Sequence, residues 1–518
     1  MNKNRICKTA AVVCAFSLFL SLLPVIYCSF FNYATGDDLG YSGGLRQAMA
    51  GGESLAGLIK LIASEVRTSY HVWQGTWSSL FLFHLQPGIY GERWYTLTTW
   101  IALACILGGT AMFLHEILCR LMRHSRSVFI AVFSLVSLIS VQYMPKIRGG
   151  LFWYTSIAHY IIPYGFSLLV LAWSLRFLSG GKRRYLFFMA AACAYLGGAG
   201  YPEIVLTLVW LFFVFFLEIT GITKLSTGKG SRRIWLLLIP FLLETAGFLV
   251  SAAAPGNSVR GGEDFGFSVS RVFSTIFGAI WMGASETLGY FVRCPLLIIM
   301  ILVTGVLAWT DFPERMPADT DEEERICDGA DMPAGWKLAV VAVLGFLLTC
   351  AVRAPEVYAG VEVSGGVPDT YFLVGVLYLA LLSAGLGSLA GVHYPVDRRF
   401  RPVMITVSLI CAVVLFLGAK AAVKNSNDFI CINYVRSGQL KDFTEQMEER
   451  LRILEDDSIK EVILPEMNDE QGPFMHMPLL RDPNAFTNWA TANYYGKSSV
   501  IAVPREEYNR IREASGPD

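Results

Sequence analysis

Long apolar runs, each of roughly 16 to 22 residues, recur along this chain and are separated by short polar segments. Of its 518 residues, 54% are hydrophobic and only 16% are charged. In a soluble domain about 25% of the residues are charged. A run of this length can cross a bilayer as one helix, and a soluble fold does not contain so many of them. The sequence therefore predicts an all-α protein that crosses a lipid bilayer many times.

Lysines and arginines predict which way the spans run, because they concentrate on the cytoplasmic side. Three of them, Lys3, Arg5 and Lys8, precede the first run. We therefore expect a cytoplasmic N-terminus, an uncleaved first span and a first outer loop at residues 31–95. This assigns residues 1–423 to a transmembrane domain of about eleven helices in the plasma (inner) membrane. The ten later spans are expected at about 95–118, 127–143, 161–178, 185–200, 201–219, 234–253, 294–309, 337–352, 371–392 and 404–421.

Residues 272–292 are apolar enough to form another span, but they contain Ser274, Ser285 and Glu286. If they crossed the membrane, every later loop would change sides, and the basic segment 393–401 would face outward against the positive-inside tendency. We therefore prefer a re-entrant or interfacial helix here, which places the C-terminal residues outside. Residues 424–518 are polar, with helical periodicity followed by two short strand patterns. They predict a small α/β domain with a helix at 442–454 and strands at 460–464 and 498–503.

Charge and cysteine usage exclude two classes of function. Lysine plus arginine and aspartate plus glutamate each number 42, so no basic field favours nucleic acid as a partner. Most of the eleven cysteines lie inside apolar runs, and no C-x-x-C pair is present, which argues against a zinc or redox site. The predicted partner of the chain is the lipid bilayer.

Two adjacent carboxylates, Asp37 and Asp38, follow the first span at its predicted outer end. Carboxylates at the mouth of a span are costly unless they are solvated, paired or functional. One would act as a general base toward an acceptor hydroxyl group while the other orients it, or both would bind a divalent cation, Mg²⁺ or Mn²⁺. The alternative is an N-cap for a helix that begins after Gly40. A doublet exceeds what a cap requires, so we favour the functional interpretation. No other cofactor is indicated.

Further polar residues fall on the same predicted face. Glu203, after Pro202, is a second acid or base, a partner for an arginine, or an ordinary acidic residue in a first helical turn. Arg260 follows a tight turn. Its planar guanidinium could bind phosphate oxygens, or its side chain could simply extend its charge to the membrane surface. The remaining candidates for substrate binding have structural alternatives as turn, loop or interfacial aromatic residues: Asn257, Lys146, Arg148, Trp73, Trp77 and His159.

Four short motifs carry a family likeness. They are Asp37-Asp38, Trp73-Gln-Gly-Thr-Trp77, Ala254-Pro-Gly-Asn257 with Arg260, and Asn488-Trp489 with Tyr494-Tyr-Gly496. With this layout the chain resembles bacterial multi-pass membrane proteins related to the GT-C (GtrII-like) glycosyltransferases, and it looks closest to an uncharacterised family among them. The resemblance implies a polyprenyl-phosphate sugar donor, reaction at the outer face, and Asp37 or Asp38 as base or metal ligand. The chain lacks the arginine that is common directly after the acid pair in GtrII-like proteins, and Arg46 is the nearest one.

The expected function is transfer of a sugar from the polyprenyl-phosphate donor to a glycan or lipid acceptor of the cell envelope. The acid pair and Glu203 would be catalytic, and the basic residues would meet the leaving phosphate. One alternative is a transporter or flippase of lipid-linked sugars, for which Glu116 and Glu244 are the main ionisable candidates within spans. Another is a non-catalytic protein of envelope assembly.

Overall fold

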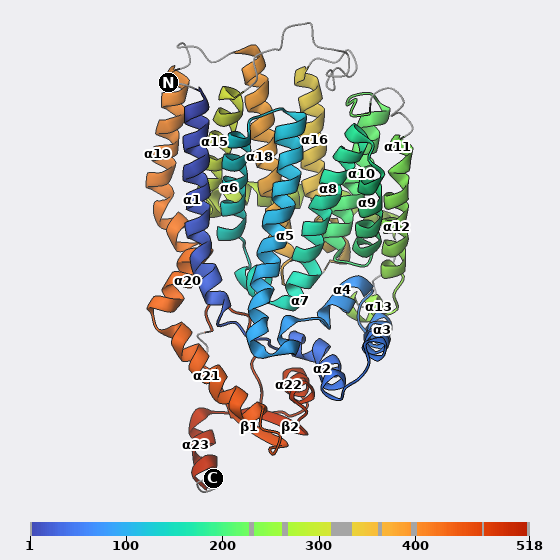
Figure 1. Cartoon of the computed structure of the whole chain (residues 1–518), viewed down its shortest axis with the longest axis vertical. Helices are drawn as coiled ribbons and strands as arrows, with labels where there is room; N and C mark the ends of the chain where they lie inside the picture. The colour runs from blue at the N-terminus through green and yellow to red at the C-terminus, as the bar shows by residue number, and fades with distance from the viewer. Residues whose placement is uncertain are drawn as a thin grey trace.

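The computed structural model describes residues 3–226, 233–261, 268–311, 334–360, 365–394, 401–468 and 471–514. Long helices lie side by side in a bundle, with the N-terminus at one end and the last elements of the chain beyond the other (Figure 1). We call the end that carries residues 424–514 the C-terminal end of the bundle and the opposite one the N-terminal end.

The bundle has the helices that a multi-span membrane protein requires. Within the described ranges, eight segments are long and apolar enough to cross a membrane, or nine if one bent helix pair counts as a single span. This confirms the predicted all-α, multi-span class of protein. The eight segments are Cys7–Ser29, Glu92–Leu121, Tyr154–Gly180, Tyr201–Ile219, Arg233–Ala252, Ala334–Ala351, Val367–His393 and Thr406–Lys424.

Every one of the eleven predicted spans is helical, but three are short. Helices α6, α9 and α15 have 17, 14 and 15 residues, whereas a straight crossing needs about 20. Helix α12 also has 15 residues, but with α11 (Arg233–Leu236) before it the segment reaches 20. A count of eleven crossings therefore stays a prediction. The eleven helices are α1 (Lys3–Ser29), α5 (Leu97–Leu114), α6 (Arg126–Gln142), α8 (Ile162–Gly180), α9 (Arg183–Leu196), α10 (Tyr201–Ile219), α12 (Leu238–Ala252), α15 (Leu296–Thr310), α16 (Ala334–Ala351), α18 (Val367–His393) and α19 (Arg401–Lys424).

Helix α14 (Val269–Arg293) is bent by 98° relative to α15, the helix that follows it. Its Gly278 and Gly283 pack closely against Val357 of α17 (Ala354–Ala359) and Cys350 of α16. Its opposite face exposes large apolar side chains, among them Trp281 at 77%. A bend of this size defines a broken span or a re-entrant segment, and the second of these is the interpretation that we preferred from the sequence.

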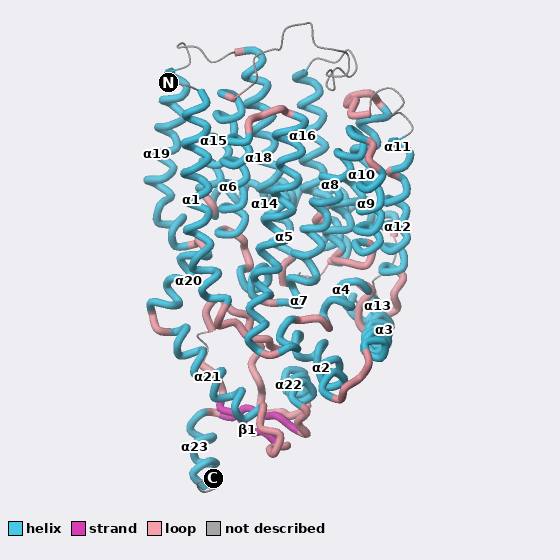
Figure 2. Tube along the Cα trace, viewed as in Figure 1, coloured by secondary structure: helices cyan, strands magenta, loops and turns pink. Residues whose placement is uncertain are grey.

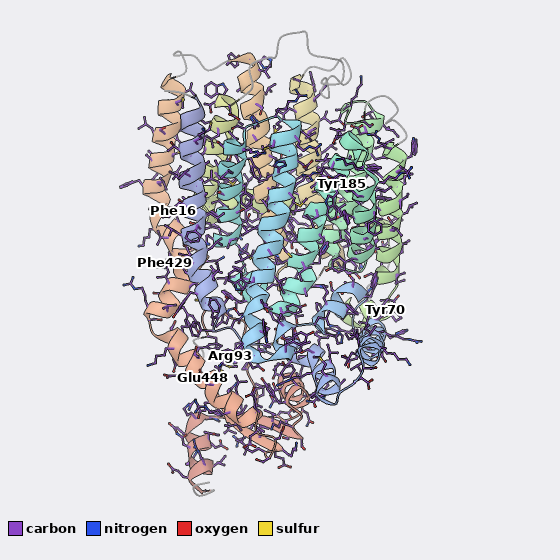
Figure 3. The ribbon with its side chains drawn as sticks, viewed as in Figure 1. Phe16, Tyr70, Arg93, Tyr185, Phe429 and Glu448 are labelled. Atoms are coloured by element: carbon purple, nitrogen blue, oxygen red, sulfur yellow. The ribbon has the colours of Figure 1, made fainter. Side chains whose placement is uncertain are left out.

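The outer surface of the bundle is apolar, as a lipid-facing surface requires. Phe16 of α1 is 60% exposed and projects outward, as Figure 3 shows, while Val25 and Cys28 of the same helix are fully buried. Helix α1 is therefore apolar on both faces, and one of them packs on α6. This pattern distinguishes a membrane helix from an amphipathic surface helix, which has one polar face.

At the C-terminal end, short helices from the first loop lie next to the last elements of the chain (Figure 1). Two strands, β1 and β2, pair in parallel with Val462 opposite Val500 (Figure 2, magenta). The predicted helix and both predicted strands of this region are present; that it forms a separate domain stays a prediction. The elements are α2 (Asp37–Ala50), α3 (Leu55–Val72), α4 (Trp77–Phe83), α13 (Gly256–Gly261), α20 (Asn427–Arg436), α21 (Gln439–Leu454), β1 (Glu461–Pro465), α22 (Phe486–Tyr495), β2 (Ser499–Val503) and α23 (Arg505–Ala514).

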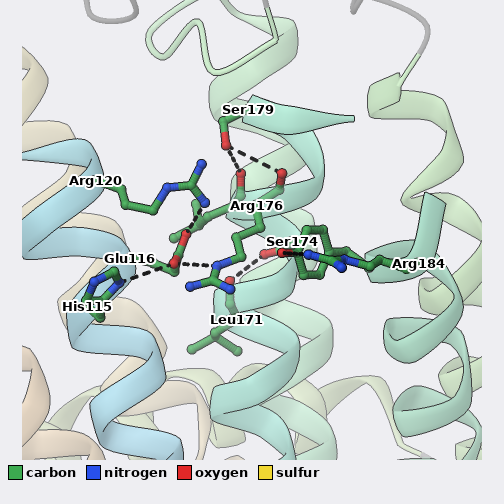
Figure 4. Close-up of polar contacts among 10 residues, drawn as sticks. His115, Glu116, Arg120, Leu171, Ser174, Arg176, Ser179 and Arg184 are labelled. Atoms are coloured by element: carbon green, nitrogen blue, oxygen red, sulfur yellow. Dashed lines mark hydrogen bonds and ion pairs between the residues drawn. The ribbon is translucent and has the colours of Figure 1, made fainter. Parts of the chain in front are cut away.

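Toward the N-terminal end, a buried carboxylate joins two helices (Figure 4). Glu116 lies in a π-helical segment, His115–Leu121, that continues α5. It forms ion pairs with Arg120, at 2.9 Å, and with Arg176 of α8. One of the two ionisable residues that the sequence analysis placed within spans is therefore neutralised by neighbouring cations.

Candidate functional site

The two members of the acid pair have different environments, and Asp38 is the buried one. It lies in the first turn of α2 and is 0% exposed. Its Oδ1 accepts hydrogen bonds from the backbone N–H and the hydroxyl group of Thr155, at 2.8 and 2.6 Å, and its Oδ2 accepts one from the Tyr95 hydroxyl. Burial raises the pKa of this carboxyl group to about 6, because desolvation outweighs these hydrogen bonds. Asp38 fixes the start of α2 to the bundle.

Asp37 is the half-buried member of the pair and is the first residue of α2. Tyr41 lies one turn further along α2, on the same face as Asp37. The Tyr41 ring packs on Phe83 of α4 at 4.9 Å, and the Phe83 ring packs on His159 at 5.5 Å. His159 belongs to the π-helical segment η5 (Ile157–Ile161). Through Phe83, these ring contacts link the start of α2, which carries Asp37 and Tyr41, to His159 of η5. We call this region between α2, α4 and η5 the α2–η5 site.

Glu203 lies next to η5 of this site, on the other side of Gly200. It is 0% exposed in the first turn of α10, and its Oε1 accepts a hydrogen bond from the Thr370 hydroxyl at 2.7 Å. Its Oε2 has no hydrogen-bond partner among the described residues. A Cβ atom added at Gly200 would lie 2.4 Å from this Oε2 and 2.7 Å from the carbonyl oxygen of His159. The absence of a side chain at Gly200 therefore allows Glu203 and η5 to approach each other.

Two charged residues near Glu203 were missed by the sequence analysis. Asp369, next to Thr370, is 0% exposed, and its Oδ1 accepts the backbone N–H of Lys146 at 2.7 Å. Arg353 is also 0% exposed and pairs with Glu286 at 2.8 Å. The signal that would have found both is a charge at the end of an apolar run, the same signal that singled out Asp37 and Asp38.

Asn257 and the tryptophans mainly join two loops. The Asn257 Oδ1 accepts the backbone N–H of Gly75 at 2.9 Å, and its Nδ2 donates to the carbonyl oxygen of Ser251 at 2.8 Å. Trp77 packs so closely on Gly198 that a Cβ atom there would lie 2.3 Å from the indole ring, while Trp73 is 46% exposed. The second and third of the four motifs therefore pack against each other.

The first and fourth motifs also meet, through α2 and α22. A Cβ atom added at Gly43 would lie 2.6 Å from the side-chain Nδ2 of Asn493. Gln47 donates to the carbonyl oxygen of Tyr494 at 3.0 Å, and the Arg46 guanidinium stacks on the Tyr494 ring at 4.1 Å. Arg46, the arginine nearest to the acid pair, thus contacts an aromatic ring of the C-terminal segment.

The basic candidates do not converge on the acid pair. Lys146 and Arg148 are exposed, and the Arg148 Nη2 donates to the carbonyl oxygen of Gly472 at 3.0 Å. Arg260 lies on α13, and its side chain is outside the described residues. The structure therefore brings together Asp37, Asp38, His159 and Glu203, and it places Arg148 beside the C-terminal segment.

The predicted divalent-cation site does not fit Asp38. Both of its oxygens already accept hydrogen bonds from Tyr95 and Thr155, which leaves Asp37 as the ligand that the acid pair can offer. In the described part of the chain, no group of three or more histidine, cysteine, aspartate or glutamate side chains is arranged to hold a metal ion.

Fold and site together define a multi-span helical membrane protein with a carboxylate-containing site at the C-terminal end of its bundle. Comparison of the chain with protein-family models, with curated proteins and with solved structures gave no match.

Proposed function

We propose that the protein is a membrane glycosyltransferase that moves a sugar from a polyprenyl-phosphate donor to a glycan or lipid acceptor of the cell envelope. The observation that most supports this function is the difference in burial between the two members of the acid pair. Asp38 is buried and holds the first turn of α2, and Asp37 is half-buried in the same turn. A general base needs this combination of a fixed backbone and an accessible carboxylate.

In the proposed reaction, Asp37 takes the proton from a hydroxyl group of the acceptor. The hydroxyl oxygen forms a bond to the anomeric carbon of the sugar, while the bond from that carbon to the phosphate oxygen breaks with inversion. Polyprenyl phosphate leaves with the electron pair. Lys146 and Arg148, exposed cations at this end that do not contact the acid pair, would meet its charge only after it has left the α2–η5 site. Glu203 is a positioning residue beneath η5.

We further propose the eleven-span topology, with α14 re-entrant, a cytoplasmic N-terminus and the C-terminal segment outside. It would place the α2–η5 site at the outer face of the plasma membrane. A reporter that is active on one side only, fused after Asp518, tests this arrangement. Activity on the cytoplasmic side would contradict it.

The test of the transfer itself uses the full chain reconstituted into vesicles with polyprenyl-phosphate sugars and an acceptor extract. We expect release of polyprenyl phosphate by the wild type and loss of this release in Asp37→Asn. Glu53→Gln is the matched control, because Glu53 is an exposed carboxylate in the same loop. Undiminished release by folded Asp37→Asn protein would refute the proposed base.

A flippase of lipid-linked sugars is the second candidate, and one observation favours it. Glu244 of α12 is 0% exposed, its carboxylate lies beside the Cys193 thiol, and it forms no ion pair in the described ranges. Ionisable residues buried within spans are typical of ion-coupled transporters. The same vesicles distinguish the two functions. A flippase carries the sugar lipid across intact and stops in Glu244→Gln, whereas a transferase releases polyprenyl phosphate.

A further inference from the structure

A narrow pocket lies between residues 33–39, which lead into α2, and the C-terminal segment. Its volume is about 40 Å³. A single water needs about 10–15 Å³, so the pocket has room for a few atoms of that size. The two basic residues in its lining are Arg450 and His476, and the other walls are mainly aromatic and aliphatic, among them Tyr33, Leu39, Phe443, Met447, Met477 and Tyr495.

Arg450 is a buried cation without a carboxylate partner in the described part of the chain. It is 5% exposed, and its Nε and Nη2 donate to one acceptor, the carbonyl oxygen of Pro465, at 3.2 and 2.7 Å. Its Nη1 has no hydrogen-bond partner among the described residues. The neighbouring carboxylate of Glu449 pairs with Arg505 instead, at 3.0 Å. Glu449 and Glu466 attract Arg450 from beyond ion-pair distance, so no carboxylate among the described residues contacts the guanidinium. An anion bound directly to this buried cation would therefore stabilise it.

His476 is the second basic residue in the lining of this pocket. Its half-buried ring makes no hydrogen bond to any residue that the structure describes. Its pKa is lowered to about 4, first by burial and then by the charges of Arg450 and Arg148. The charges of two arginines from separate parts of the chain therefore help to lower the pKa of this one imidazole. An anion placed here would be attracted by both guanidinium groups and would favour a proton on His476.

We infer that this pocket binds a single phosphate group through the guanidinium of Arg450, with His476 in the same lining. A guanidinium is the side chain best matched to phosphate oxygens, and the small volume admits a phosphate but no larger head group. The phosphate is either a free ion or the terminal phosphate of a lipid at the membrane surface. The site goes beyond the proposed transfer reaction, since it needs neither Asp37 nor a sugar.

The test measures binding to the purified full chain without any sugar donor, so its result is separate from that of the transfer assay. Calorimetric titration with inorganic phosphate should show one site, which Arg450→Gln weakens by about tenfold or more. Because Arg450 also holds Pro465, His476→Gln is the second variant; its ring makes no hydrogen bond to lose, and a several-fold weakening is expected. Arg452→Gln is the matched control, because Arg452 is an exposed arginine of the same helix, α21, and this variant should bind like the wild type.

Vesicles that contain phosphatidic acid distinguish the two sources of phosphate. Displacement of inorganic phosphate by these vesicles, but not by phosphatidylcholine vesicles, supports a lipid phosphate. Binding without displacement supports a free ion. Absence of binding to phosphate and to phosphatidic acid at millimolar concentration would overturn the inference. Equal affinity in the wild type, Arg450→Gln and His476→Gln would overturn it as well.

Discussion

The carboxylate of Asp38 accepts two hydrogen bonds from one residue, Thr155, through its backbone N–H and its hydroxyl group. Tyr95 donates to the other carboxylate oxygen. Residues 38, 95 and 155 belong to three separate segments of the chain, so a single buried side chain joins the first loop to two parts of the bundle. Asp37, the adjacent residue, takes its position from this junction.

The first prediction concerns the strength of the Asp38 junction. Asp38→Ala leaves the Thr155 N–H and the Tyr95 hydroxyl buried without an acceptor, and it should lower the free energy of unfolding by about 2–4 kcal/mol. Asp38→Asn keeps one acceptor oxygen and a similar shape, so its loss should be smaller. Chemical denaturation in detergent micelles measures both. Equal losses would show that the hydrogen bonds are not the cause.

The second prediction is a pH dependence with a defined sign. The folded-state pKa of Asp38 is about 6, above the ordinary value of 3.8, so the folded protein holds this proton more tightly than the unfolded chain does. The free energy of unfolding should therefore fall as pH rises from about 4 to about 6, by about 2 kcal/mol from this group. Subtracting the pH profile of Asp38→Asn isolates this contribution. Parallel profiles would contradict it.

The third prediction tests the contact between Glu203 and η5. Gly200→Ala would place a methyl group against the Glu203 carboxylate and the His159 carbonyl, so it should cost about 1–3 kcal/mol of stability. Gly108→Ala is the control, because no heavy atom lies within 4 Å of the added Cβ in the middle of α5. This control should be neutral or slightly stabilising. Thermal unfolding of both variants would decide, and similar midpoints would argue against close packing at Gly200.

The fourth prediction is an energetic coupling between Glu116 and Arg176. Glu116→Gln leaves the partly buried Arg176 without its carboxylate and should cost about 1–3 kcal/mol. Combining it with Arg176→Gln should cost less than the sum of the two single changes, because the interaction can be lost only once. A double-mutant cycle on free energies of unfolding measures the interaction free energy between Glu116 and Arg176. Strict additivity would mean that the ion pair contributes nothing.

The helices were predictable from the sequence, and the number of crossings was not. An apolar run of this length identifies a helix because, in lipid, the backbone polar groups of a single span must bond within that span. Whether a run crosses depends on its length and on its angle to its neighbours. Helices α6, α9 and α15 are short, and α14 turns through 98° at residues 294–295. Pro295 marks the break in the sequence but does not define the angle, which accompanies the packing of α14 on α16 and α17.

The acid pair was predictable as a pair, but the separate roles of its members were not. Asp38 is buried because Tyr95 and Thr155, which lie 57 and 117 residues away in the chain, supply its donors. Asp369 and Arg353 were missed for the same reason, since their partners Lys146 and Glu286 come from other segments. The roles of Asp37, Glu203 and the basic candidates stay predictions.

The packing of α2 on α22 has a consequence for how the protein is made. Gly43 lies against Asn493, and Arg46 stacks on Tyr494, so one face of α2 rests on residues that leave the ribosome about 450 positions later. During translation this face has no support, although every span is already synthesised. A polypeptide released before residue 486 would hold its membrane helices and lack the support for α2. Synthesis of α22 is therefore the step that supplies the support for α2.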